Sequence, residues 1–270
     1  AGGPAYAGGH DANAEYRPTV LITGSNRGIG LEFVRQYSAL DWRIIATCRN
    51  PEQAGDLKTL AARDSDISVV ALDITDHAAV DNLARELKNQ PIDVLLNNAA
   101  KLGDAETQNF GSIDYAQFQT VLAVNVIGPV KVSEAFVDHV AASRQKKIVT
   151  LGSAAGSNGL IGPVPNLFAY RSSKAGLHIA MHNMALALAE RGIVVGLINP
   201  GLVDTRGILD LKPGDPVPEV FKPLIPLIES GQLELMRPTE SVAQMIELID
   251  GLTAEQAGQF LNFDGAVLPW

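Results

Sequence analysis

From residue 19 onward, short apolar runs of strand length alternate with longer segments of helical spacing. The runs rich in β-branched residues predict strands over 19–23, 42–48, 67–73, 92–99, 146–153 and 192–201. The segments between them predict helices over 28–40, 51–63, 77–89, 115–143 and 170–191. This alternation is typical of β-α-β units, whose right-handed crossovers place helices on both faces of a parallel sheet. We therefore predict an α/β fold, a single-domain doubly wound parallel sheet with its ligand at the carboxyl ends of the strands.

The pattern breaks after residue 201. Five prolines lie between 213 and 226 and exclude one regular helix. The segment still carries apolar residues that favour burial, namely Val220, Phe221, Leu224, Ile225, Leu227 and Ile228. We predict a Pro-rich lid over about 202–238, built from one or two short helices; an ordinary surface excursion is the alternative. Beyond it we predict a helix over 239–252, with Thr239 as its N-cap, and a last strand over 258–265.

The first 17 residues are rich in Gly and Ala and show no periodicity. They predict a flexible N-terminal tail (1–17) before a domain that comprises 18–270. A remnant of an export signal is the alternative, although neither the charged nor the apolar part of such a signal is visible. Cys48 is the single cysteine, which excludes an intrachain disulfide and fits a reducing, cytoplasmic location.

Charge and composition limit the classes of partner. The formal net charge is −9 and Lys and Arg form no stripe, so general nucleic-acid binding is not expected. No uninterrupted apolar run reaches the roughly 18 residues of a membrane span, and we expect no membrane partner. The five histidines show no spacing that requires a metal, and no metal site is expected.

The stretch "TGSNRGIG" (23–30) follows the first predicted strand and opens the first helix. Gly24, Gly28 and Gly30 let the backbone turn sharply and approach a ligand closely. The helix N-terminus then offers free N–H groups and a partial positive charge to a pyrophosphate. A tight strand-to-helix turn also needs glycine, but its place in an α/β pattern favours a dinucleotide site.

The end of the second strand indicates which dinucleotide binds. An NAD site usually has an acidic residue there for the ribose 2′-hydroxyl, and "IIATCRNP" has none. Arg49 stands there instead, and Arg27 lies within the glycine loop. Guanidinium groups bind phosphate oxygens well, so we predict NADP(H) rather than NAD(H). The alternative is that both arginines are solvated surface residues.

Tyr170 and Lys174 are the candidate acid–base pair. They are i and i+4 in a predicted helix and therefore share one face. A nearby ammonium lowers the pKa of a tyrosine, which makes it a usable general acid or base. Ser153 follows the fifth strand and could donate to the same substrate oxygen. Asn125 lies in an apolar helix, where it could bend the helix and hold a water, or be an ordinary hydrogen-bonded core residue.

These motifs together resemble one family. "TGSNRGIG", "NNAA", Asn125, Ser153, "YRSSK" and "NPGLVDT" occur in the order and approximate spacing of the short-chain dehydrogenase/reductase family. The resemblance extends over about 18–270, and the terminal D-G-x3-P-W is similar to the C-factor and Sniffer-like carbonyl reductase branch. It implies a Rossmann fold. It also implies a homodimer or homotetramer in which the long helix 114–142 and the helix from 170 pair with their copies.

The resemblance also implies residue roles. Tyr170 would be the proton donor and acceptor, and Lys174 would bond the nicotinamide ribose and lower the pKa of Tyr170. Ser153 would orient the carbonyl, and Asn125 would hold a proton-relay water. The cofactor residues implied, from the adenosine end to the nicotinamide, are Gly24, Arg27, Gly28, Ile29, Gly30, Arg49, Asp73, Ile74, Asn97, Ala99, Tyr170, Lys174, Pro200, Gly201, Val203 and Thr205.

Three features depart from the family pattern. Ala100 in "NNAA" stands where the family usually has glycine. His178 stands where this branch often has asparagine. The segment between Ser153 and Tyr170 is somewhat long, which affects the wall of the substrate pocket more than the chemistry.

The favoured function is an NADPH-dependent reductase of ketones or aldehydes, with an apolar or aromatic carbonyl substrate suggested by Phe221 and its neighbours. An alcohol dehydrogenase working in the oxidative direction uses the same residues. Two further functions are compatible with the same fold: an NADPH-binding signalling protein with little turnover, and an epimerase or dehydratase.

Overall fold

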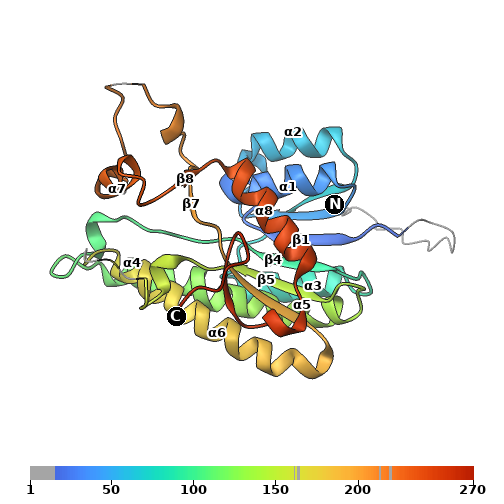
Figure 1. Cartoon of the computed structure of the whole chain (residues 1–270). Helices are drawn as coiled ribbons and strands as arrows, with labels where there is room; N and C mark the ends of the chain where they lie inside the picture. Colours follow the sequence, from blue (N-terminus) through green and yellow to red (C-terminus); the bar gives the residue numbers. More distant parts are fainter. Residues whose placement is uncertain (1–15, 161, 163–164, 213, 219–220) are drawn as a thin grey trace.

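The computed structural model describes residues 16–270 except 161, 163–164, 213 and 219–220. The predicted tail up to residue 15 and Val220 of the lid therefore lie outside the described residues. Seven strands form one sheet, all neighbours parallel, in the order β3-β2-β1-β4-β5-β6-β9 (Figure 1). They are β1 (Thr19–Thr23), β2 (Arg43–Cys48), β3 (Ile67–Ala71), β4 (Val94–Asn97), β5 (Lys147–Leu151), β6 (Val194–Asn199) and β9 (Phe260–Asn262). The doubly wound parallel sheet is confirmed, and its strand order reverses between β1 and β4.

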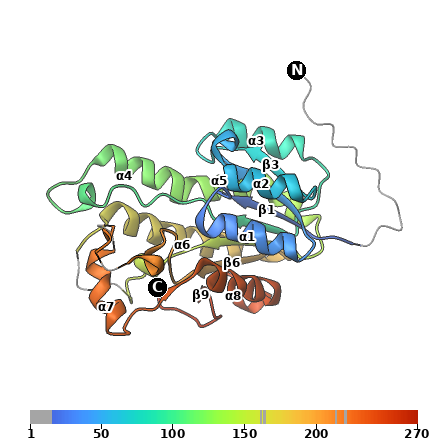
Figure 2. The same ribbon diagram turned by 90° about the horizontal axis from the view of Figure 1, so that it is seen from above.

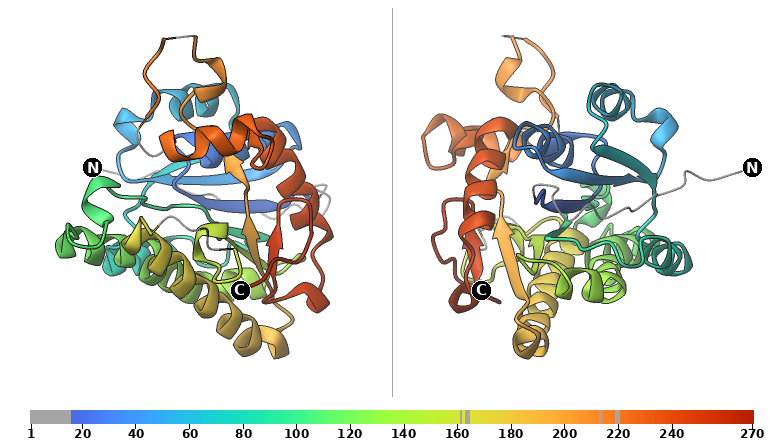
Figure 3. Two further views of the ribbon diagram at one scale, coloured as in Figure 1. Left: turned by 60° about the vertical axis from the view of Figure 1, so that its left-hand side comes forward. Right: turned by 90° about the vertical axis from the view of Figure 1, so that its right-hand side faces the viewer.

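Helices cover both faces of the sheet (Figure 3). One face carries α1 (Gly28–Ala39), α2 (Gly55–Arg63) and α8 (Pro238–Gly251). The other carries α3 (His77–Glu86), α4 (Tyr115–Leu122), α5 (Gly128–Ala141) and α6 (Phe168–Leu188). Each face has its own apolar cluster, and every residue of β1, β4 and β5 is buried between them. Near-continuous apolar strands are what a sheet covered on both faces requires.

The long helix predicted over 115–143 is interrupted. A π-helical turn, Ala123–Ile127, separates α4 from α5, and Asn125 lies inside it. The combined helix Tyr115–Ala141 is long and apolar enough to cross a membrane by length and composition alone. In this fold it packs against α3 and α6 and buries Val132 and Phe136 completely.

The segment between β6 and α8 contains a two-stranded parallel pair, β7 (Leu202–Val203) with β8 (Leu235–Met236), and the short helix α7 (Ile225–Glu229). It projects from the sheet at the same end as α4 and the start of α6 (Figure 2). Phe221 is buried, whereas Leu227 is exposed. The helix that follows begins one residue earlier than predicted: Arg237 is the N-cap of α8 and Pro238 opens it, so Thr239 as the N-cap was wrong.

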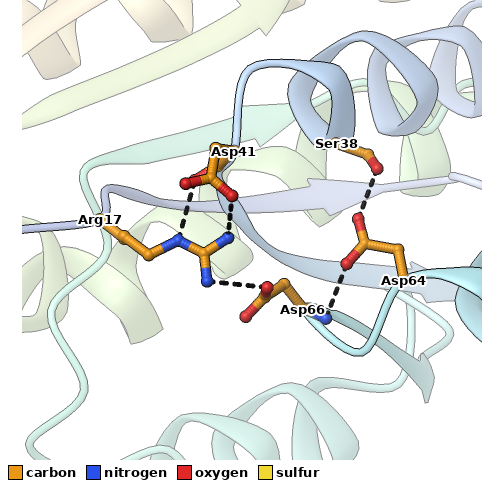
Figure 4. Close-up of polar contacts among 5 residues, drawn as sticks. All are labelled: Arg17, Ser38, Asp41, Asp64 and Asp66. Atoms are coloured by element: carbon orange, nitrogen blue, oxygen red, sulfur yellow. Dashed lines mark hydrogen bonds and ion pairs between the residues drawn. The ribbon is translucent and has the colours of Figure 1, made fainter.

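The chain is attached to the domain before β1 begins. Arg17 forms ion pairs with Asp41, in the α1–β2 turn, and with Asp66, just before β3, the latter at 2.8 Å (Figure 4). Asp64 beside them accepts from the Ser38 hydroxyl and from the backbone N–H of Asp66. Tyr16 donates its hydroxyl to Asp93. Contacts with the domain therefore begin two residues before the predicted boundary at 18.

Candidate active site

The glycine loop lies at the carboxyl end of β1, as the sequence predicted. Gly24 and Gly28 have φ of 69° and 54°, which side chains rarely adopt. A Cβ on Gly30 would lie 2.3 Å from the carbonyl oxygen of Gly24, so only glycine lets α1 approach the loop this closely. The first turn of α1 has no side-chain cap and contains no acidic residue, so its free backbone N–H groups remain at the end of the glycine loop. This is the donor arrangement that binds an anion.

Asn98, which was not among the predicted site residues, connects the β1 loop to the β4 loop. Its Nδ2 donates to the carbonyl oxygens of Thr23 (2.8 Å) and Gly24 (3.0 Å). The backbone N–H groups of Asn98 and Ala99 both donate to the Thr23 hydroxyl at 3.1 Å. The motifs "TGSNRGIG" and "NNAA" thus form one hydrogen-bonded unit at the switch in strand order.

Arg27 and Arg49 are both exposed near the adenosine end of the predicted site. Arg27 is the N-cap of α1, and Arg49 directly follows β2. Within the described part of the chain neither forms an ion pair with a carboxylate. Asp73 follows β3 nearby: burial alone would raise the pKa of this carboxyl, but hydrogen bonds from Thr75 and the charge of Arg49 lower it.

Four other residues predicted at the cofactor are buried or half-buried. Asn97 is 3% exposed; its Nδ2 donates to the hydroxyls of Ser133 (2.9 Å) and Thr150 (3.3 Å), and its buried Oδ1 has no partner among the described residues. Ile74 is buried against Gly128, where a Cβ would lie 2.7 Å from its side chain. Ala99 is half-buried beside Gly24. Ile29, on the first turn of α1, is also half-buried.

The segment after β6 reaches the same loop. The carbonyl oxygen of Pro200 accepts from the Ser241 hydroxyl at 2.7 Å, which attaches this segment to α8. Gly201 has φ of 80°, and Val203 is buried in β7. A Cβ on Gly28 would lie 3.2 Å from the Thr205 side chain, so Thr205 stands directly beside the glycine loop.

Lys174 is almost fully buried on α6, at 3% exposure. Its Nζ donates to the carbonyl oxygen of Leu151, the last residue of β5, at 2.8 Å, and lies 5.8 Å from the centre of the Tyr170 ring. Burial disfavours the ammonium and lowers the pKa of Lys174 to about 8.

Tyr170 is half-buried one turn earlier on α6, and its hydroxyl is hydrogen-bonded to the Ser153 side chain. The sequence led us to expect a lowered pKa for this tyrosine, and the structure corrects that expectation. Burial raises the pKa of Tyr170 above its ordinary value, and the hydrogen bond to Ser153 offsets only part of the effect. Tyr170 therefore keeps its proton at neutral pH but is a weaker acid than the sequence led us to expect.

Asn125 is 1% exposed and satisfied by protein atoms. Its Nδ2 donates to the Lys101 carbonyl oxygen (2.8 Å) and the Ser173 hydroxyl (2.9 Å), and its Oδ1 accepts from the Lys101 backbone N–H (2.7 Å). The side chain holds the π-helical turn against α6 and the loop after β4. The helix changes form at Asn125, and the three bonds of its side chain are those of the alternative, a hydrogen-bonded core residue.

Two residues that position the pair were not predicted. The Gln108 side chain accepts from the backbone N–H of Tyr170 at 2.9 Å. His178, one turn after Lys174, accepts the backbone N–H of Ser153 on Nε2 at 3.3 Å. Nothing in the hydrophobic pattern marks Gln108. His178 was noted only as a departure from the branch. In the described residues, no group of three or more His, Cys, Asp and Glu side chains could hold a metal ion.

Comparison with known proteins identifies the family. The family model for short chain dehydrogenases matches residues 18–213. The chain belongs to the short-chain dehydrogenase family. An uncharacterised oxidoreductase of Schizosaccharomyces pombe is 31% identical over 93% of this chain and 96% of its own length. The C-signal protein of Myxococcus xanthus is 30% identical over 67% of this chain and 93% of its own length.

Solved structures agree with this assignment. An NADPH-bound carbonyl reductase from chicken fatty liver is 28% identical, with a TM-score of 0.78. The carbonyl reductase Sniffer of Drosophila melanogaster is 25% identical, with a TM-score of 0.77. Each alignment covers 94% of this chain and 100% of the other. The single-domain Rossmann fold and the likeness to Sniffer-like carbonyl reductases are confirmed, and this short-chain dehydrogenase is an oxidoreductase.

Proposed function

We propose that this short-chain dehydrogenase is an NADPH-dependent carbonyl reductase in which Tyr170 protonates the carbonyl oxygen. The observation that carries the proposal is the hydrogen bond between Ser153 and Tyr170 beside a buried Lys174. A tyrosine holds its proton at neutral pH, and the adjacent Lys174 charge favours the tyrosinate that forms when this proton is given to the oxygen of a ketone or aldehyde. The solved structure of the NADPH-bound chicken enzyme supports the choice of reaction.

The described residues fit a nicotinamide dinucleotide phosphate. The loop of positive φ at Gly24 and Gly28 leaves a cradle before the uncapped N-terminus of α1, suited to the diphosphate. Arg27 and Arg49 are exposed and have no carboxylate ion pair among the described residues, so both are available to a 2′-phosphate. Lys174 and the segment from Pro200 to Thr205 would hold the nicotinamide end. NADPH, when bound, supplies the hydride that reaches the carbonyl carbon.

The chain's own groups handle the proton. Ser153 Oγ and Tyr170 Oη converge at the carboxyl end of β5, where both can donate to one carbonyl oxygen. As the carbonyl carbon accepts the hydride, Tyr170 transfers its hydroxyl proton to the oxygen and an alcohol forms. The charge of Lys174 stabilises the tyrosinate that remains. In the reverse direction the same tyrosinate would remove the proton from an alcohol.

Aromatic side chains support an apolar or aromatic substrate. Phe168 opens α6 two residues before Tyr170, and its ring centre lies 6.1 Å from that of Phe110. Phe110 is 86% exposed on the loop after β4, an unusual position for a large apolar ring. With Phe221 in the predicted lid, these rings would form an apolar wall beside the reacting carbonyl.

We also propose a cytoplasmic homodimer or homotetramer. Exposed apolar side chains lie along the α4–α5 helix and α6, which supports pairing of these helices with their copies: Tyr115, Ile127, Ile179 and Leu186. The single cysteine, Cys48, is buried and unpaired, in keeping with a reducing compartment.

The test measures binding and turnover separately. NADPH and NADH are titrated by cofactor fluorescence, and NADPH consumption is then followed with a panel of aromatic and aliphatic aldehydes and ketones. We expect tighter binding of NADPH than NADH, turnover with apolar carbonyl compounds, and loss of turnover but not of binding in Tyr170→Phe. Binding without turnover on the panel would favour a signalling protein, and product formation without net NADPH oxidation would favour an epimerase or dehydratase.

A further inference from the structure

A cleft of about 550 Å³ lies between α1 and α8. Trp42, just before β2, and Gln145, two residues before β5, form part of its lining. Because parallel strands all begin at one edge of their sheet, this cleft lies at the edge opposite Ser153, which follows β5. Its volume is within the range of about 300–1,000 Å³ typical of small-molecule sites.

One wall carries a buried polar group with no partner. Tyr37, on α1, is 1% exposed and lines the cleft, and its hydroxyl has no hydrogen-bond partner among the described residues. The Asp250 carboxylate, which also lines the cleft, is close enough to act on Tyr37: burial first, and then this charge, raise the pKa of the tyrosine. A buried hydroxyl without a hydrogen-bond partner is destabilising, and a ligand group that reached it from the cleft would offset that effect.

The charge around the cleft is negative. Glu247 and Asp250 lie on one face of α8, both exposed, and no ion pair of either is seen within the described residues. The helices α1 and α8 end beside the cleft, at Ala39 and Gly251. Their C-termini add partial negative charge. No Lys or Arg lines the cleft. Lys147 is outside the lining, but its Nζ donates to the backbone carbonyl oxygen of Asp250 at 2.7 Å, and its charge also interacts with the Asp250 carboxylate.

The other wall is aromatic and apolar. The rings of Tyr37 and Trp42 are 4.7 Å apart between centres and tilted by 52°. Leu40 is 54% exposed beside them, and Ile246 faces them from α8. A cation gains from aromatic faces as well as from carboxylates. We propose that this cleft binds a small organic cation, an amine that carries an apolar group, with the ammonium at Glu247, Asp250 and Tyr37 and the apolar group against Trp42.

The chain offers a direct reporter of this site. It contains two tryptophans, Trp42 in the cleft and Trp270 beside His178 and His182. In a Trp270→Phe variant of the full chain, tryptophan emission comes from Trp42 alone. We would titrate this variant with phenethylamine and with N-acetylphenethylamine, which has the same ring but no charge. A saturable change in emission is expected with the amine. The acetylated compound is expected to bind more weakly by about tenfold or more.

Variants in the same background test each part of the site. The pair Glu247→Gln and Asp250→Asn should weaken amine binding about tenfold or more, whereas Glu255→Gln, an exposed carboxylate outside the cleft, should leave it unchanged. Tyr37→Phe should weaken it severalfold while keeping the ring. Added salt should weaken binding, because it screens the charges. Binding should persist with saturating NADPH.

Three results would overturn the proposal. These are no saturable change in Trp42 emission, equal affinity for the neutral compound, and displacement of the amine by NADPH. None of these measurements uses catalysis, so failure of the proposed reductase activity and failure of this site are distinguishable.

Discussion

The side chain of Gln108 caps the helix that carries the catalytic pair: its Oε1 accepts the backbone N–H of Tyr170 at 2.9 Å. Tyr170 is in the first turn of α6, where backbone N–H groups have no partner within the helix. The Gln108 Nε2 donates to the carbonyl oxygens of Leu102 (2.8 Å) and Asp104 (3.1 Å). Gln108, itself 1% exposed, thus fixes the start of α6 to the loop that follows β4.

Gln108→Ala should therefore lower kcat about ten- to a hundredfold, because it releases the start of the helix on which Tyr170 lies. KM should change much less, and the free energy of unfolding should fall by about 1–3 kcal/mol through the lost buried hydrogen bonds. Gln117→Ala is the matched control. Gln117 holds the same loop through Asp104 and Thr107, and among the described residues it makes no hydrogen bond to α6. Equal losses of kcat in the two variants would show that Gln108 acts only through the loop.

Lys174 should lower the free energy of unfolding at neutral pH, although turnover requires it. Its pKa is about 8 in the fold against 10.5 in the unfolded chain, so between these values the unfolded chain binds more protons and stability rises with pH. At pH 7 the burial of the charge costs about 3 kcal/mol, and the bond to Leu151 returns about 1 kcal/mol. Lys174→Met should thus raise the free energy of unfolding by about 2 kcal/mol at pH 7 and by less at pH 10, while turnover is lost.

Lys147→Met is the control for that measurement. Lys147 is also buried, has a pKa lowered first by burial, and donates to a backbone carbonyl oxygen, but it lies far from Tyr170 at the start of β5. It should retain turnover. Urea unfolding at pH 7 and pH 10 gives both stabilities. A Lys174→Met protein less stable than wild type at pH 7 would contradict the assigned cost of the buried charge.

Much of the fold follows from the sequence because its strands are buried on both faces. Runs such as Val20, Leu21 and Ile22 are apolar without alternation, which distinguishes a parallel sheet covered by helices from a half-exposed one. The start of α8 was misplaced for a local reason. Thr239 is a preferred N-cap residue, but Pro238 can occupy the first position of a helix, and the cap therefore falls on Arg237.

The site was predictable only where local sequence determines geometry. Tyr170 and Lys174 share a face because helical spacing requires it. The direction in which the pKa of Tyr170 shifts depends instead on burial by segments distant in sequence. Helical spacing alone cannot predict that burial. Gln108 and Asn98 act through bonds to residues 62 and 74–75 positions away, and neither carries a local signal for such a partner.

Gly30 should tolerate no side chain. A Cβ there would lie 2.3 Å from the Gly24 carbonyl oxygen and 2.5 Å from Asn98 Nδ2, and both atoms are held by the bond between them. Gly30→Ala should lower the free energy of unfolding by about 3 kcal/mol or more and weaken NADPH binding through the displaced loop. Gly55→Ala, at the start of α2 with nothing within 4 Å, should be neutral or stabilising by up to about 1 kcal/mol. Chemical denaturation compares the two; a mild Gly30→Ala would mean that the loop can shift.

His178 should make the protein sensitive to acid. Burial, and then the charge of Lys174, lower its pKa to about 4 from 6.5. Between these values the unfolded chain binds the proton and the folded chain does not, so stability falls as pH falls from 6.5 to 4. The loss should reach about 2 kcal/mol by pH 5. His178→Asn should abolish this part of the loss, because an amide oxygen is neutral throughout and can still accept the Ser153 N–H.

The measurement is the urea midpoint at pH 7 and pH 5 for wild type, His178→Asn and His182→Asn. His182 lies one turn further along α6 and bonds the Gly258 carbonyl oxygen, so its variant tests whether any histidine of this helix has the same effect. An acid loss that persists in His178→Asn would place the sensitivity in other groups. If the asparagine variant also keeps kcat, the backbone contact with Ser153, and not the imidazole, is what the active site needs at this position.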